Sequence, residues 1–264
     1  MDVTGTLTAA GVIGGLGILV GLLLGKAGKI FKVEENETET AVREALPGNN
    51  CGACGYPGCD GLAKAIAEGK APTNACPVGG AAVAEKVAAI MGGDSEQPGE
   101  RMVAYVRCGG DCDKAKDVYQ YVGPEICSIA VNSPGGGPKG CAFGCLGYGE
   151  CKSVCEFGAI NMVDGIAVID PEKCVACGKC VSVCPRHLIR LVPASKDHHI
   201  RCSSADRGLD VKKVCSVGCL ACTMCVKQCP VEAITMQGNL PVIDYEKCVN
   251  CGACQKKCPA KTIS

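Results

Sequence analysis

Cysteine is the residue type most able to do chemistry in this chain, with 25 copies among 264 residues. Thiols at such density form disulfides, bind a metal ion such as zinc, or hold iron–sulfur clusters. His187, His198 and His199 show neither catalytic nor zinc-binding spacing, and we interpret them as loop or surface residues. The glycine-rich turn at 134–138 lacks the strand–loop–helix setting of a nucleotide site. The sequence therefore predicts that cysteines carry the chemistry.

The first cysteine group has the spacing C-x2-C-x4-C-x16-C, and its members are Cys51, Cys54, Cys59 and Cys76. Three thiolates on one glycine-rich loop can hold three corners of a [4Fe–4S] cluster. The fourth follows a short helix expected over residues 58–68. Zinc is the alternative, but zinc sites usually take two close pairs of cysteines. We predict a cluster here.

An internal repeat organises the later cysteines. Eight cysteines between residues 141 and 184 recur 74 positions later, between residues 215 and 258. A match in register over this length indicates a duplicated module. Three runs, which begin at Cys174, Cys219 and Cys248, read C-x2-C-x2-C-x3-C-P. Short hairpins are expected around Asp164-Gly165 and Gly238-Asn239.

The three runs resemble those of bacterial two-cluster ferredoxins, in which three close cysteines hold one cluster and the fourth reaches the other. The resemblance implies a ligand set for each run. The sets are Cys174, Cys177 and Cys180 with Cys155; Cys219, Cys222 and Cys225 with Cys258; and Cys248, Cys251 and Cys254 with Cys229.

A fourth run departs from this pattern, because Tyr148 stands where the later copy has Cys222. Matching positions remain at Cys145, Cys151 and Cys184, and we expect Cys141 to supply the missing ligand. Five cysteines stay unassigned: Cys108, Cys112, Cys127, Cys202 and Cys215. Cys108, Cys112 and Cys127 with a shared Cys141 could bind a sixth cluster, while free buried thiols are the alternative. We expect at least five [4Fe–4S] clusters, with the sixth left open.

The N-terminal segment from Val3 to Gly25 carries no charge. As a helix it would be about 34 Å long, against about 30 Å for the hydrocarbon core of a bilayer. Asp2 alone precedes it, without the basic segment of a cleaved signal peptide. We predict a single-pass anchor in the cell membrane. Lys26, Lys29 and Lys32 would leave the cysteines on the cytoplasmic side, where thiols stay reduced.

Composition limits the fold class. The chain has no Trp, 6 Tyr and 3 Phe, so small domains with few large apolar side chains need staples. Lys+Arg and Asp+Glu both number 27 without a basic block, and we expect no nucleic-acid partner. We predict an α+β protein of small iron–sulfur-stapled domains. The expected parts are a transmembrane helix over 1–32, a mostly helical four-cysteine domain over 33–92, a linker over 92–99, and ferredoxin-like modules over 101–193 (with extra cysteines) and 200–264.

This order of parts resembles the B component of the Rnf-type ion-translocating ferredoxin:NAD⁺ oxidoreductases, in an extended polyferredoxin form. The apolar N-terminus followed by CGACGYPGC and Cys76-Pro77 is its most diagnostic part. The resemblance implies the electron-transfer subunit of a translocase. It would accept electrons from soluble ferredoxin and pass them to membrane subunits while the complex moves Na⁺ or H⁺. It implies no substrate chemistry in this chain alone.

Two other functions remain open from the sequence. The chain could be the polyferredoxin arm of another anchored enzyme, such as a hydrogenase, or a zinc-stabilised scaffold. Lys256, Lys257 and Lys261, which lie near the last cysteine run, could steer an acidic redox partner.

Overall fold

The computed structural model describes residues 3–30, 36–93 and 100–264. Its longer helices are α1 (Val3–Ile30), α2 (Glu37–Ala45), α3 (Gly58–Ala67), α4 (Gly80–Met91) and α8 (Gly208–Val214). Its shorter helices are α5 (Cys127–Ala130), η1 (Pro134–Gly136), α6 (Glu150–Ser153), α7 (Lys179–Val183), α9 (Met224–Lys227) and α10 (Ala253–Lys257). Its strands are β1 (Met102–Val106), β2 (Ile160–Val163), β3 (Ile166–Ile169), β4 (Ile189–Pro193), β5 (Ile234–Gln237) and β6 (Leu240–Ile243).

The N-terminal segment is helical, as predicted, and forms α1. Across the described parts of the chain, no helix is both long enough and apolar enough to cross a membrane. The structure therefore does not support the transmembrane helix predicted over residues 1–32. Glycines at 11, 14, 15, 17, 21 and 25 lengthen α1 without adding apolar side chains. Residues 1–2 and 31–32 of that prediction, and 94–99 of the linker, lie outside the described residues.

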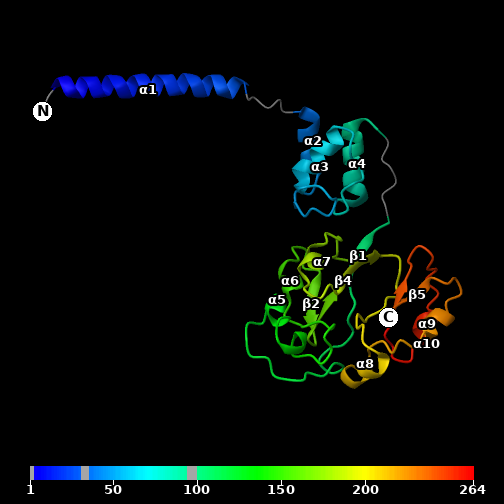
Figure 1. Cartoon of the computed structure of the whole chain (residues 1–264). Coiled ribbons are helices and arrows are strands. Elements are labelled where there is room, and N and C mark those ends of the chain that lie inside the picture. The colour runs from blue at the N-terminus through cyan, green and yellow to red at the C-terminus, as the bar shows by residue number, and fades with distance from the viewer. Residues whose placement is uncertain (1–2, 31–35, 94–99) are drawn as a thin grey trace.

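Helices α2, α3 and α4 pack together around one small core (Figure 1). Asn36 caps α2, since its side-chain oxygen accepts a hydrogen bond from the Thr38 N–H at 3.0 Å. Leu62 and Ile66 of α3 and Val42 of α2 are almost fully buried in this core. The helices thus build a scaffold for the loop that carries Cys51, Cys54 and Cys59.

The rest of the chain contains two similar units that are built on two-stranded sheets. β2 pairs with β3 and β5 pairs with β6, both antiparallel and in equivalent register. These are the two predicted hairpins. In the first unit β1 also pairs with β4, with Val106 opposite Ile189. In the second unit Ile200 lies opposite Ile263, the residue 74 positions after Ile189, in a single bridge. These two outer pairings were not predicted from the sequence.

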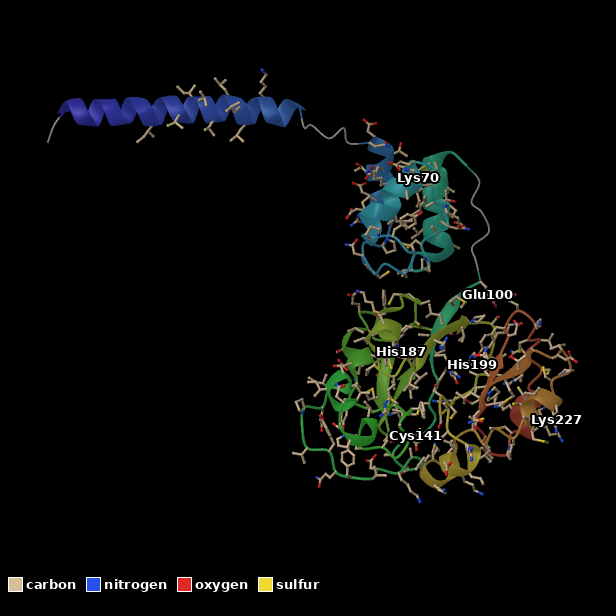
Figure 2. The ribbon with its side chains drawn as sticks, in the orientation of Figure 1. Lys70, Glu100, Cys141, His187, His199 and Lys227 are labelled. Atoms are coloured by element: carbon tan, nitrogen blue, oxygen red, sulfur yellow. The ribbon has the colours of Figure 1, made fainter. Side chains whose placement is uncertain are left out.

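Aromatic rings pack where the two units meet. His199 lies between Tyr105 of β1 and Tyr245, with ring centroids at 4.5 and 5.5 Å (Figure 2). Its Nδ1 forms a hydrogen bond with the Tyr245 hydroxyl at 2.7 Å. Burial lowers the pKa of His199 and raises the pKa of Tyr245 to about 12. His199 therefore lies in a loop, one of the two placements we expected, and it packs between the units rather than on the surface.

Candidate iron–sulfur centres

The cysteine loops share one backbone shape. In the run from Cys174, Ala176 and Gly178 have φ of 55° and 77°, and His187 after the fourth cysteine has φ of 50°. The equivalent positions in the other three runs all lie between 50° and 87°. They are Gly147, Gly149 and Gly158; Ala221, Thr223 and Glu232; and Asn250, Gly252 and Lys261.

Left-handed backbone is costly for residues with a Cβ, by roughly 1–2 kcal/mol each. Such strain persists only where a local interaction demands the conformation. Turns of this kind direct successive N–H groups to one side and so form a concave anion-binding surface. The repeat in sequence is thus also a repeat of four loops shaped to surround a negatively charged group.

The departing run keeps this shape even though Tyr148 replaces the cysteine. Gly147 and Gly149, on either side of Tyr148, have φ of 87° and 78°. The Tyr148 ring packs on Tyr121 with 5.7 Å between centroids. The loop is therefore intact, and a ligand must reach it from another segment.

Four cavities of similar size each have four cysteines on their walls. Each encloses about 350–400 Å³ of space, including its opening to solvent. Two of them bring together cysteines that the ferredoxin resemblance pairs. One set is Cys219, Cys222, Cys225 and Cys258, and the other is Cys155, Cys174, Cys177 and Cys180.

The third cavity corrects our expectation for Cys141. It is lined by Cys145, Cys151 and Cys184, together with Cys127 rather than Cys141. Cys127 begins α5, and this helix is held to α6 because the Ser128 N–H and hydroxyl donate to the Glu150 carboxylate at 2.6 and 2.9 Å. Cys141 follows Cys108 by 33 positions, whereas Cys215 follows Cys202 by 13, and the extra segment of the first unit carries Cys127. Cys127 on this insertion therefore lies in the place of the cysteine ligand that Tyr148 replaces in the loop.

The fourth cavity collects cysteines that were not grouped together from the sequence. Cys108, Cys141, Cys202 and Cys215 line it, and the first three are only 7–8% exposed. The predicted grouping of Cys108 with Cys112 and Cys127 does not occur. Cys112 is exposed, and its N–H donates to the Asp164 carbonyl. Cys141 and Cys215 are 74 residues apart, which is the offset of the internal repeat, and this relation was the sequence signal that could have indicated a common role.

For the two remaining predicted sets, the structure brings some of the cysteines close together. In the helical unit, burial raises the pKa of Cys76, and the nearby Cys59 and Cys54 add to that shift. In the last unit, burial likewise raises the pKa of Cys254, with Cys248 and Cys251 close enough to contribute. Cys229, Cys248 and Cys254 pack around the same core of Ile200, Ile234 and Ile263.

Backbone N–H groups point at the sulfur atoms. The donors are Ala104 to Cys174 at 3.2 Å, Leu188 to Cys184 at 3.5 Å, Ala233 to Cys229 at 3.2 Å and Thr262 to Cys258 at 3.3 Å. Such hydrogen bonds favour the thiolate over the thiol and tune the potential of a bound cluster.

Burial opposes ionisation of these thiols when no metal is bound. It raises the pKa of Cys151 and Cys180 to about 12 and of Cys219 to about 11. Because the metal ligand is the thiolate, occupation of these sites must release protons.

The cysteines surround their cavities rather than converge on one point. Within the described residues, no set of three or more His, Cys, Asp or Glu side chains could hold a single metal ion. Zinc needs its sulfur ligands about 2.3 Å from one ion, whereas a cubane offers each thiolate its own iron. Four thiols around an apolar cavity, with N–H donors on the sulfurs, fit a [4Fe–4S] cluster.

Comparison with known families assigns three of these segments to iron–sulfur proteins. Residues 46–78 match the FeS family of Fe-S cluster proteins. Residues 167–190 match the 4Fe-4S binding domain and residues 218–262 match the 4Fe-4S dicluster domain.

Three curated relatives are similar over most of this chain. One is the B component of the Na⁺-translocating ferredoxin:NAD⁺ oxidoreductase complex of Acetobacterium woodii, 45% identical over 92% of this chain and 72% of its own length. Another is the B component of the ion-translocating oxidoreductase complex of Methanosarcina acetivorans, 42% identical over 90% of this chain and 89% of its own length. The third is the B component of the proton-translocating ferredoxin:NAD⁺ oxidoreductase complex of Clostridium ljungdahlii, 42% identical over 88% of this chain and 82% of its own length.

Proposed function

The chain belongs to the family of B components of Rnf-type ion-translocating oxidoreductase complexes, and from this premise we propose that it is the multi-cluster electron-transfer subunit of a ferredoxin:NAD⁺ oxidoreductase. The family resemblance expected from the sequence is confirmed. The observation that carries the proposal is the set of four equivalent left-handed loops, three of which have four cysteines around one cavity. Such sites accept and release single electrons.

We assign five clusters to five of the cysteine groups. Within the predicted division into 33–92, 101–193 and 200–264, the first lies in the helical domain and two lie in each ferredoxin-like module. The sets are Cys51, Cys54, Cys59 and Cys76; Cys155, Cys174, Cys177 and Cys180; Cys127, Cys145, Cys151 and Cys184; Cys219, Cys222, Cys225 and Cys258; and Cys229, Cys248, Cys251 and Cys254.

Electrons enter at the last module from a reduced soluble ferredoxin. Cys222 and Cys251 are exposed, and each belongs to one of the two cysteine groups of that module. Lys256, Lys257 and Lys261 are exposed beside them. A positive surface next to an accessible cluster favours the docking of an acidic electron carrier.

Electrons leave through the helical domain to membrane subunits of the same complex. Burial is the main cause that raises the pKa of Cys177, and the charge of the nearby Cys51 raises it further. The helical-domain cluster therefore neighbours the cluster on Cys174, Cys177 and Cys180. We place the clusters on the cytoplasmic side of the cell membrane, where thiols stay reduced. The names of the relatives give Na⁺ for one and protons for another, so the coupling ion is a property of each complex.

Anaerobic reconstitution followed by stopped-flow mixing with reduced ferredoxin tests this function. We expect broad visible absorbance that bleaches as ferredoxin is oxidised, and iron and sulfide in equal amounts. The Lys256→Ala variant tests docking separately from cluster assembly, because it should slow the bleaching without changing the iron content. Stoichiometric zinc with no bleaching would show a structural scaffold instead.

A further inference from the structure

The cavity lined by Cys108, Cys141, Cys202 and Cys215 lies between the two ferredoxin-like modules, which each supply two of its cysteines. We propose that these four residues bind a sixth [4Fe–4S] cluster, which conducts electrons from one module to the other. The relay role rests on the proposed function, whereas the site itself does not. The family matches at 46–78, 167–190 and 218–262 include none of the four residues.

The four cysteines are two pairs of equivalent residues. Cys141 and Cys215 are 74 positions apart, in register with the repeat. Cys108 comes two residues after Val106, which pairs with Ile189. Cys202 comes two residues after Ile200, which pairs with Ile263, the equivalent of Ile189 in the repeat. Each module therefore brings two equivalent cysteines to the cavity.

Reciprocal hydrogen bonds fix the two modules around this cavity. The Gly109 N–H donates to the Arg201 carbonyl at 3.0 Å, and the Ser203 hydroxyl donates to the Arg107 carbonyl at 3.2 Å. The segment that contains Lys116 runs between the two halves: its N–H donates to the Val214 carbonyl at 3.0 Å, and its carbonyl accepts from Gly140 at 2.8 Å. Cys141 and Cys215 directly follow Gly140 and Val214. The backbone thus holds Cys141 on the side of the first module that faces α8 (Figure 2).

Glycine keeps space open beside two of the sulfur atoms. A Cβ at Gly110 would stand 3.2 Å from the Cys215 sulfur and 3.9 Å from the Cys108 sulfur. Gly144 and Gly218 also line the cavity. Small residues at these places leave the space that a cubane would fill.

The polar groups around the cavity suit a negatively charged cluster. The N–H of Cys145 donates to the Cys108 sulfur at 3.3 Å, and the N–H of Ser204 donates to the Cys202 sulfur at 3.5 Å. Arg107 and Arg201 line the cavity, and none of the described residues on its wall is acidic. The four thiolates carry more negative charge than the cubane core carries positive charge, so the occupied site is negative. Arg107 and Arg201 therefore stabilise it.

The site contacts a cluster site of each module. On one side, Cys145 of the first module donates its N–H to Cys108. On the other, Gly218 lines this cavity, and the next residue, Cys219, lines the cavity of Cys222, Cys225 and Cys258. A cluster held by the four cysteines would take one electron from a reduced neighbour at Cys219 and pass it to a cluster at Cys145, which would return the central cluster to its oxidised state. No bond or proton changes place.

Native mass spectrometry of the full chain, reconstituted anaerobically with iron and sulfide, counts the clusters without any substitution. We expect six cubanes in the unmodified chain and six in the Cys112→Ala control, because Cys112 belongs to no group. Cys202→Ala should hold five. A count of five in the unmodified chain, or of six in Cys202→Ala, would overturn the site.

The relay is tested separately by mixing with reduced ferredoxin. In the unmodified chain we expect all clusters to be reduced in one fast phase. In Cys202→Ala only the two clusters of the last module should be reduced quickly, about two-fifths of the bleaching. Equal fast phases in both proteins would refute the relay. No reduction of either protein would refute the proposed function, while a count of six would still establish the site.

Discussion

The substitutions Cys127→Ala and Tyr148→Cys together test which residue supplies the fourth cysteine ligand to the loop of Cys145 and Cys151. In the structure Cys127 reaches the cavity of Cys145, Cys151 and Cys184 from α5. Tyr148 already occupies the position in the loop where the other runs place a ligand, because the glycines on both sides keep the left-handed backbone. A cysteine at 148 should therefore replace the one removed at 127.

The size of each effect follows from the contacts. Cys127→Ala removes one of four thiolates, so we expect the loss of one cluster in six, about one-sixth of the iron and sulfide. Tyr148→Cys gives up the ring contact with Tyr121, worth about 0.5–1.5 kcal/mol beyond the buried area. That loss is small against the roughly 5–15 kcal/mol that stabilises a folded domain. The double variant should fold and recover the full iron content.

The assay is iron, sulfide and native mass on the unmodified chain, both single variants and the double variant, reconstituted side by side. Tyr148→Cys alone should keep every cluster and shows whether the new thiol perturbs the loop. Full iron in Cys127→Ala would refute the assignment of Cys127. A double variant no better than Cys127→Ala would refute the idea that the loop is preformed around Tyr148.

Three further outcomes are expected. Ile66→Ala should lower the free energy of unfolding of the helical unit by about 2–5 kcal/mol in denaturant titrations, because Ile66 is 1% exposed; an equal loss in the half-exposed control Ile90→Ala would contradict this. The double change of Lys256 and Lys257 to Glu should raise the KM for reduced ferredoxin several-fold and weaken its dependence on salt, and an unchanged KM would exclude docking at this surface. Burial lowers the pKa of His199, so the unfolded chain binds the proton first as pH falls through about 6.5, and stability declines there. Melting curves of His199→Gln should change less over that range, and parallel curves would show that another group is responsible.

Features repeated in the sequence were predicted well. The 74-residue repeat, the three complete runs and both hairpins depend on local spacing and turn residues, and the structure forms those hairpins and loops there. The short helix expected over residues 58–68 also forms, as α3 from Gly58 to Ala67.

Features that depend on contacts between segments far apart in the sequence could not be predicted in this way. Cys141 was the nearest cysteine to the incomplete loop in sequence, but α5 brings Cys127 there through an insertion whose path no periodicity reveals. The partnership of Cys108 with Cys202 spans two modules and does not keep the 74-residue offset. It follows only from the pairing of strand ends with Ile189 and Ile263, which are far away along the chain.

The equal division of the central cavity between the modules has a consequence for assembly. Neither half carries enough ligands to capture iron there by itself, so docking of the halves and filling of the cavity become a single equilibrium. Free energy released when the metal group is captured then adds to the association of the halves and increases with the logarithm of the free iron and sulfide concentrations. When iron is scarce, the association of the two halves would therefore be weaker than when iron is plentiful.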